Sequence, residues 1–245
     1  MNERVGVSPR DVWRCYEFAR DMQGHHNNTL IMQRSSQQIF RDDLRGKLAE
    51  IAVKKYLERQ NHNVGELDFE IYDLGTWDRD DIVVDNSVHV SVKSSGENAN
   101  YLLIETNRFD PETGEYSYRN NNGDRIIVNY YAFVNVSIAG EHEDDFTTHT
   151  DMCDFLQIED DTWTAGAQRV MCYLRGFLSD DQFWRIKRLA PRGIKATKDN
   201  FGRVSRDENV VADPAFVEND RRWLQKDNYL VCLDQFGEYL PQLTT

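Results

Sequence analysis

The stretch Asp81-Ile-Val-Val-Asp-Asn-Ser-Val-His-Val-Ser-Val-Lys93 decides the fold expected for this chain. Residues 81–85 and 87–95 predict two short strands, and the Asp-Asn pair between them is typical of a hairpin turn. Successive side chains of a strand point to opposite faces. The valines of the second strand therefore share one face, and Ser91 and Lys93 share the other.

A helix is predicted upstream of the hairpin, over residues 36–60, with Gly46-Lys-Leu-Ala-Glu-Ile-Ala at its centre. Apolar side chains recur along it at helical spacing and give it a broad apolar surface. Glu50 borders that surface. Its carboxylate is therefore either a solvated residue at the rim or an inward-facing ligand.

The other elements follow from periodicity and turn signals. Residues 8–22 begin with Ser8-Pro9, a signal for a helix start, and residues 179–189 open with a capping-box pattern. Further strands are expected at 68–74, 101–105, 115–119, 126–138, 167–177 and 229–233. This mixture of helices and strands predicts an α/β fold: a central mixed β-sheet flanked by helices, with an N-terminal helical extension.

With 245 residues, the chain is long enough to bury a substantial core as one domain. Over residues 1–245 we expect a helical extension (1–35), a core with the candidate site (36–140), and then an acidic loop, a basic helix-loop and a closing strand (141–245). No apolar run is long enough for a transmembrane helix, and the first residues lack a signal-peptide pattern. The four scattered cysteines form no C-x-x-C pair. We therefore expect a cytoplasmic protein.

Charge is distributed unevenly along the chain. The formal net charge of −13 by itself disfavours nucleic-acid binding, because attraction to phosphate supplies much of that affinity. Residues 141–162 hold nine acidic side chains and no Lys or Arg, whereas residues 185–206 hold eight basic side chains and one acid. The basic segment is either a solvated face or an anion-binding surface. Its candidate DNA-binding residues are Arg185, Lys187, Arg188, Arg192, Lys195, Lys198 and Arg203.

The hairpin and the helix supply groups that metal-assisted phosphodiester hydrolysis needs. Mg²⁺ takes oxygen ligands and is usually held by one or two carboxylates plus substrate phosphate. Asp81 is the first candidate ligand, and Glu50 is the second. Lys93 could orient or deprotonate the attacking water, or neutralise charge. The ordinary alternatives are that Asp81 is a turn residue, that Glu50 is a solvated helix residue and that Lys93 is an exposed strand lysine.

These residues resemble the PD-(D/E)xK nuclease superfamily of restriction-endonuclease-like proteins. The likeness covers residues 40–95, with Glu50 on the helix, Asp81 on the hairpin and Val90-Ser-Val-Lys93 on the next strand. It implies Mg²⁺-dependent cleavage of DNA, with catalytic roles for Glu50, Asp81, Ser91 and Lys93. It also implies a setting in restriction or phage defence, and a homodimer, since many enzymes of this type pair to cut both strands.

Ser91 occupies the place where the superfamily has an acid two residues before the lysine. A serine hydroxyl is a neutral and weaker ligand for Mg²⁺ than a carboxylate. Some restriction enzymes with Ser-Val-Lys at this place recruit a glutamate from elsewhere in the fold. The resemblance makes Glu105, on the next predicted strand, the candidate metal ligand, with Glu97 as a looser alternative. Otherwise the site has lost its activity and only binds.

Three functions are consistent with the sequence. The leading one is a Mg²⁺-dependent endodeoxyribonuclease. The second is a non-catalytic binding protein on the same fold, favoured by Ser91 and by the net charge, in which the acidic segment 141–162 could mimic DNA. The third is an enzyme adapted to high salt, whose acidic surface reflects its surroundings instead of its activity.

Overall fold

A computed structural model describes residues 3–22, 25, 36–71, 81–97, 99, 101–119, 124–138, 170–190 and 227–232. Its main feature is a mixed five-stranded sheet with the order β1-β8-β7-β3-β2. The strands are β1 (Glu3–Val5), β2 (Ile82–Val84), β3 (Val88–Gly96), β7 (Tyr130–Ile138) and β8 (Val170–Ser179). β3 and β7 run parallel, and the other neighbours run antiparallel. The prediction of an α/β fold with a mixed sheet is confirmed.

The hairpin has the turn that its sequence predicts. Asp85 and Asn86 have φ angles of 50° and 63°, and Ser87 N donates to the Val84 carbonyl at 3.1 Å. Two successive left-handed residues make a type I′ turn, which matches the natural twist of a hairpin, and Asp and Asn tolerate that conformation. The turn fixes the register in which Ile82 lies opposite Val90.

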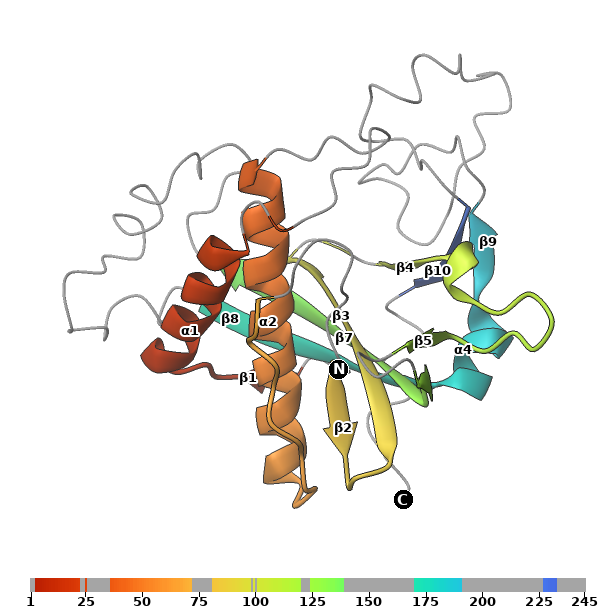
Figure 1. The fold of residues 1–245 in the computed structure, drawn as a ribbon, viewed down its shortest axis with the longest axis horizontal. Coiled ribbons are helices and arrows are strands. Elements are labelled where there is room, and N and C mark those ends of the chain that lie inside the picture. Colours follow the sequence, from red (N-terminus) through yellow and green to blue (C-terminus); the bar gives the residue numbers. More distant parts are fainter. Residues whose placement is uncertain are drawn as a thin grey trace, which may run out of the picture.

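Two helices cover one face of the sheet (Figure 1): α1 (Pro9–Asp21) and α2 (Ser36–Arg59). α1 begins with a complete capping box between Ser8 and Asp11. Lys55 of α2 forms an ion pair with Asp11, which ties the two helices together. Their apolar side chains join those of the sheet in the first core, together with Val90, Ala132 and Val134.

The opposite face of the sheet packs against a second, smaller group of elements. A three-stranded sheet has the order β4-β10-β9 and is accompanied by a 3₁₀ helix, a short α-helix and a two-stranded hairpin. These elements are β4 (Tyr101–Glu105), η1 (Thr106–Arg108), β5 (Ser117–Arg119), β6 (Arg125–Ile127), α4 (Asp180–Ile186), β9 (Arg188–Ala190) and β10 (Asn228–Cys232). Tyr131 and Phe133 of β7 meet Phe109 and Phe183 in this second core.

The prediction of a single strand over residues 126–138 is wrong. β6 pairs with β5 in the small hairpin, and β7 begins anew in the main sheet. Between them, Val128 N donates to the Tyr116 carbonyl, and Asn129 N donates to the His89 carbonyl. The alternation of apolar residues runs through both strands, but the backbone changes its partner at residues 128–129.

Three smaller expectations are also corrected. The helix expected at 179–189 ends at Ile186, because the residues that follow pair with β10 as β9. Residues 68–71 form no strand; there the Asp68 side chain accepts from Glu70 N, a local turn that competes with strand pairing. Residues 72–74 lie outside the described residues. β1 was not predicted, and its pairing with β8 makes residues 3–5 part of the sheet instead of a helical extension.

None of the described helices is long and apolar enough to span a membrane.

β8 contains a bulge that depends on a glycine. The pairing of β7 with β8 shifts between Phe133 and Val134, and Gly176 has a φ of 145°. Residues with a side chain rarely adopt that backbone conformation. We therefore expect Gly176→Ala to lower the free energy of unfolding by about 1–3 kcal/mol. Gly46→Ala in α2 is the control, because its Cβ would meet nothing within 4 Å and should stabilise by up to about 1 kcal/mol. Urea denaturation of both variants tests this; equal stabilities would contradict it.

Candidate functional site

The hairpin brings Asp81 and Ser91 into contact. Asp81 precedes β2 and, in the register of the hairpin, lies opposite Ser91. Ser91 Oγ donates to Asp81 Oδ2 at 3.0 Å, and Val92 N donates to the same oxygen at 2.6 Å. Asp81 Oδ1 takes none of the hydrogen bonds found among the described residues. Among the described residues, the carboxylate is therefore held through Oδ2.

Lys93 lies on the same face as Ser91, as the alternation predicted. Its half-buried side chain places Nζ 5.5 Å from the centre of the Tyr116 ring. Burial alone would lower the pKa of Lys93, but the charge of Asp81 and the interaction with Tyr116 outweigh it and raise that pKa above its ordinary value. Lys93 is therefore a cation at neutral pH. It is suited to neutralising charge and not to deprotonating water.

The small second group of elements contributes two residues that the sequence did not indicate, Tyr116 and Arg108. Phe109 and Tyr116 form an isolated β-bridge with their rings 5.3 Å apart, and Arg108 directly precedes Phe109. The charge of Arg108 lowers the pKa of Lys93, against the larger effect of Asp81. The site therefore lies where the main sheet meets the second group. Nothing in the local sequence pattern marks these residues, because the bridge forms through packing in the second core.

Glu50 belongs to the helical layer instead. Its Oε2 lies 2.9 Å from Lys47 Nζ in an ion pair whose side chains are only 4% (Lys47) and 10% (Glu50) exposed. Burial, followed by the charge of Glu50, raises the pKa of Cys15 on α1. α2 covers the face of the sheet that carries Val90, whereas Ser91 and Lys93 lie on the opposite face. The structure thus brings Asp81, Ser91 and Lys93 together and places Glu50 across the sheet from them.

The two glutamates considered as substitutes for an acid at position 91 lie elsewhere on the molecule. Glu105 ends β4 in the three-stranded sheet, and its Oε2 lies 3.8 Å from Arg108 Nε. Glu97 follows β3 and accepts a hydrogen bond from Ser137 Oγ at 2.7 Å.

The described residues offer Mg²⁺ a sparse set of ligands. No group of three His, Cys, Asp or Glu side chains that could hold a metal ion occurs within the part of the chain that the structure describes. Asp81 Oδ1 fits the minimal case, in which one carboxylate holds Mg²⁺ and water and substrate phosphate supply the other ligands. The neighbouring Ser91 hydroxyl is the second protein oxygen at this place.

Three of the seven candidate DNA-binding residues are among the described residues. Arg185 on α4 and Arg188 on β9 are exposed. Lys187 Nζ lies 4.2 Å from the ring centres of both Trp184 and Tyr229, so its charge rests on two aromatic faces. The acidic segment 141–162 lies outside the described residues, as do four of the candidates: Arg192, Lys195, Lys198 and Arg203.

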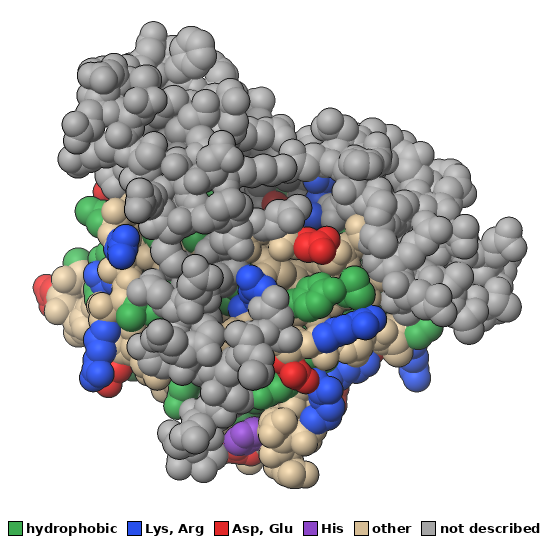
Figure 2. Space-filling model, turned by 180° about the vertical axis from the view of Figure 1, so that it is seen from behind, with side chains coloured by type: hydrophobic (Ala, Val, Ile, Leu, Met, Phe, Trp, Pro, Cys, Tyr) green, Lys and Arg blue, Asp and Glu red, His purple; other side chains and the backbone are tan. Residues whose placement is uncertain are grey.

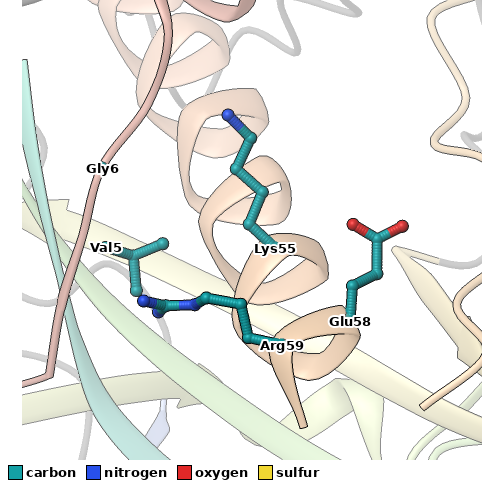
Figure 3. Close-up of a pocket in the computed structure, with 5 residues that line it drawn as sticks. All are labelled: Val5, Gly6, Lys55, Glu58 and Arg59. Carbon is teal, nitrogen blue, oxygen red and sulfur yellow. The ribbon is translucent and has the colours of Figure 1, made fainter. Parts of the chain in front are cut away.

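On the face shown in Figure 2, lysine and arginine side chains alternate with acidic and apolar ones. A surface hollow of about 380 Å³ lies between β1 and α2 and is lined by Val5, Gly6, Lys55, Glu58 and Arg59 (Figure 3). Lys55 and Arg59 are already paired there with Asp11 and Glu3. The hollow is therefore a weaker candidate site than the hairpin.

Comparisons of this chain with protein-family models, with curated proteins and with solved structures find no match.

Proposed function

We propose that this chain is a Mg²⁺-dependent endodeoxyribonuclease that hydrolyses phosphodiester bonds of DNA, with restriction or phage defence as its setting. The observation that supports it most is that Asp81, Ser91 and Lys93 share one face of the hairpin, where the charge of Asp81 raises the pKa of Lys93. Among the described residues, the hydrogen bonds to the carboxylate go to Oδ2. A carboxylate and a fixed cation at one place suit the binding and cleavage of a phosphodiester.

Each residue has a distinct role in this proposal. Asp81 would hold Mg²⁺ through Oδ1, and the bound ion would act as a Lewis acid on the scissile phosphate. Ser91 and the Val92 N–H hold the carboxylate in place through its other oxygen. Lys93 neutralises the negative charge that develops on the phosphate oxygens, and Tyr116 keeps the ammonium directed to the site.

Cleavage of supercoiled plasmid DNA in Mg²⁺, with EDTA as the blank, tests the proposal. We expect Asp81→Asn and Lys93→Met each to lower the cleavage rate by about 10²–10⁴-fold, the range that a positioned catalytic group supplies. The matched controls are Asp21→Asn and Lys54→Gln, which remove one charge each from α1 and α2 and should cleave like the natural chain. Full activity in both site variants would overturn the assignment.

A second candidate function is a non-catalytic binding protein on the same fold. Two observations favour it: Ser91 replaces an acid, and Glu50 is committed to an ion pair with Lys47 on the other side of the sheet. The same assay separates the two functions. No cleavage in Mg²⁺ or Mn²⁺, together with binding to a protein partner that survives Lys93→Met, would favour this second function.

A further inference from the structure

The junction between α4 and β9 carries three basic residues within four positions: Arg185, Lys187 and Arg188. The structure divides them into two kinds. Lys187 rests on aromatic side chains, whereas Arg185 and Arg188 are exposed. The three residues therefore have different roles at this surface.

Lys187 fixes the junction between the helix and the strand. Its Nζ lies 4.2 Å from the ring centres of both Trp184 on α4 and Tyr229 on β10, and those two rings are 5.4 Å apart. A cation over an aromatic face is attracted to it, and here two faces act on one ammonium. Trp184 and Tyr229 in turn pack against Phe109 in the second core. The backbone on which the two arginines lie is therefore anchored at Lys187.

The two arginines themselves are available to a ligand. Both are exposed, and neither makes a hydrogen bond or an ion pair with another described residue. Asp181 lies one turn before Arg185 on α4, yet these two residues form no ion pair. An anchored backbone that carries unpaired guanidinium groups binds an anion without first having to rearrange.

The chemistry and spacing of the pair match a phosphate backbone. Each guanidinium presents a planar fork of N–H donors that fits two oxygens of one phosphate. Arg185 and Arg188 are three residues apart, so their Cα atoms lie within about 11 Å of each other. At a rise of about 3.4 Å per nucleotide, that distance spans about three phosphates of one DNA strand.

This surface lies within reach of the candidate site, because a series of aromatic contacts connects the two. Lys93 Nζ lies 5.5 Å from the centre of the Tyr116 ring, which is 5.3 Å from that of Phe109. The Phe109 ring is 5.4 Å from that of Trp184, on which Lys187 rests. The Nζ atoms of Lys93 and Lys187 are therefore at most about 20 Å apart, the length of about six base pairs.

We propose that Arg185 and Arg188 bind the phosphate backbone of duplex DNA, and that Lys187 positions them without contacting the DNA. The inference rests on the proposed function for its ligand. It deepens that function, because it separates the contact that holds DNA from the site at Asp81 and Lys93 that would cleave it.

Fluorescence anisotropy with a labelled 12-base-pair duplex and the full chain, in EDTA, measures binding without cleavage. We expect Arg185→Gln and Arg188→Gln each to raise Kd by about tenfold, the effect of losing one hydrogen bond to a charged group. Each should also lower the slope of log Kd against log salt by about one ion. Arg188→Lys should recover part of the affinity, because the charge remains while the fork is lost. Lys187→Met should leave the slope unchanged.

Arg10→Gln is the matched control. Arg10 is also exposed and makes no hydrogen bond or ion pair with another described residue, but it lies on α1, across the main sheet from the second group. This variant should bind the duplex within twofold of the natural chain. Leu189→Ser tests for a protein partner instead of DNA, since Leu189 is 59% exposed beside Arg188. Its Kd for the duplex should equal that of the natural chain.

The inference is overturned if the duplex does not bind in EDTA, or if both arginine variants bind it as tightly as Arg10→Gln does. It is also overturned if Leu189→Ser weakens binding as strongly as the arginine variants while the salt slope stays unchanged, because that result identifies an apolar contact. Equal thermal melting of the variants excludes unfolding as the cause of a weaker Kd. The proposed function fails separately: a chain that never cleaves DNA in Mg²⁺ can still show the arginine effects in EDTA, and a chain that cleaves can lack them.

Discussion

Replacing Glu50 by leucine is expected to lower the free energy of unfolding by about 3–5 kcal/mol, because it leaves the Lys47 ammonium buried without its carboxylate. Lys47 and Glu50 are both almost inaccessible to solvent, at 3% and 7% exposed, and their charged atoms lie 2.9 Å apart. Lys47 Nζ also lies 4.8 Å from the centre of the Phe18 ring, so an aromatic face packs against the ammonium. Urea denaturation followed by circular dichroism measures the loss.

The double variant Lys47→Met with Glu50→Leu is the control for this prediction. It removes both charges and keeps apolar volume, so it should recover most of the loss and could exceed the natural chain in stability. If Glu50→Leu, Lys47→Met and the double variant are equally stable, the buried ion pair does not contribute to the stability. If Glu50→Gln abolishes cleavage without any loss of stability, Glu50 is a metal ligand after all.

Phe183→Ala is expected to cost about 3–5 kcal/mol, as for other fully buried phenylalanines that leave a cavity. Phe183 is 0% exposed and lies at the centre of the second core. Its ring centre lies 4.9 Å from that of Tyr131 on the main sheet and 5.4 Å from that of Phe109 in the second group. The same side chain therefore joins the two parts of the fold between which the site lies.

The loss should extend to the site itself, since Phe109 is the residue through which Tyr116 is positioned. We expect Phe183→Ala to lower the rate of plasmid cleavage in Mg²⁺ as well as the stability. Phe183→Leu, which keeps most of the volume, should cost less and leave the cleavage rate near that of the natural chain. Unchanged urea midpoints for both variants would show that the second core is not a stabilising contact.

Local signals in the sequence were sufficient for the hairpin and its faces. Two neighbouring Asp and Asn residues favour the left-handed turn, and strict alternation then puts Ser91 and Lys93 on the same face of β3. The start of α1 was equally local, since the Ser8 and Asp11 side chains cap the backbone within one turn. These features depend on residues a few positions apart, which is why a pattern reveals them.

The break between β6 and β7 shows where a pattern is insufficient. Apolar alternation continues through both strands, so the sequence predicted one long strand over 126–138. The chain instead leaves the small hairpin and joins the main sheet, because Asn129 pairs with His89 of a distant strand. Periodicity indicates which side chains are buried, but it does not indicate which strand the backbone pairs with.

The sequence by itself determined that Asp81, Ser91 and Lys93 would share one hairpin face, because two-residue alternation and turn chemistry act over short distances. Only the tertiary structure decided which other residues meet them. It placed Glu50 in the helical layer and Glu105 next to Arg108 in the second group, and it brought Tyr116 to Lys93. The physical reason is that an amphipathic helix or a short strand specifies its own apolar face, whereas the packing of two cores against opposite faces of one sheet depends on contacts between residues far apart in the chain.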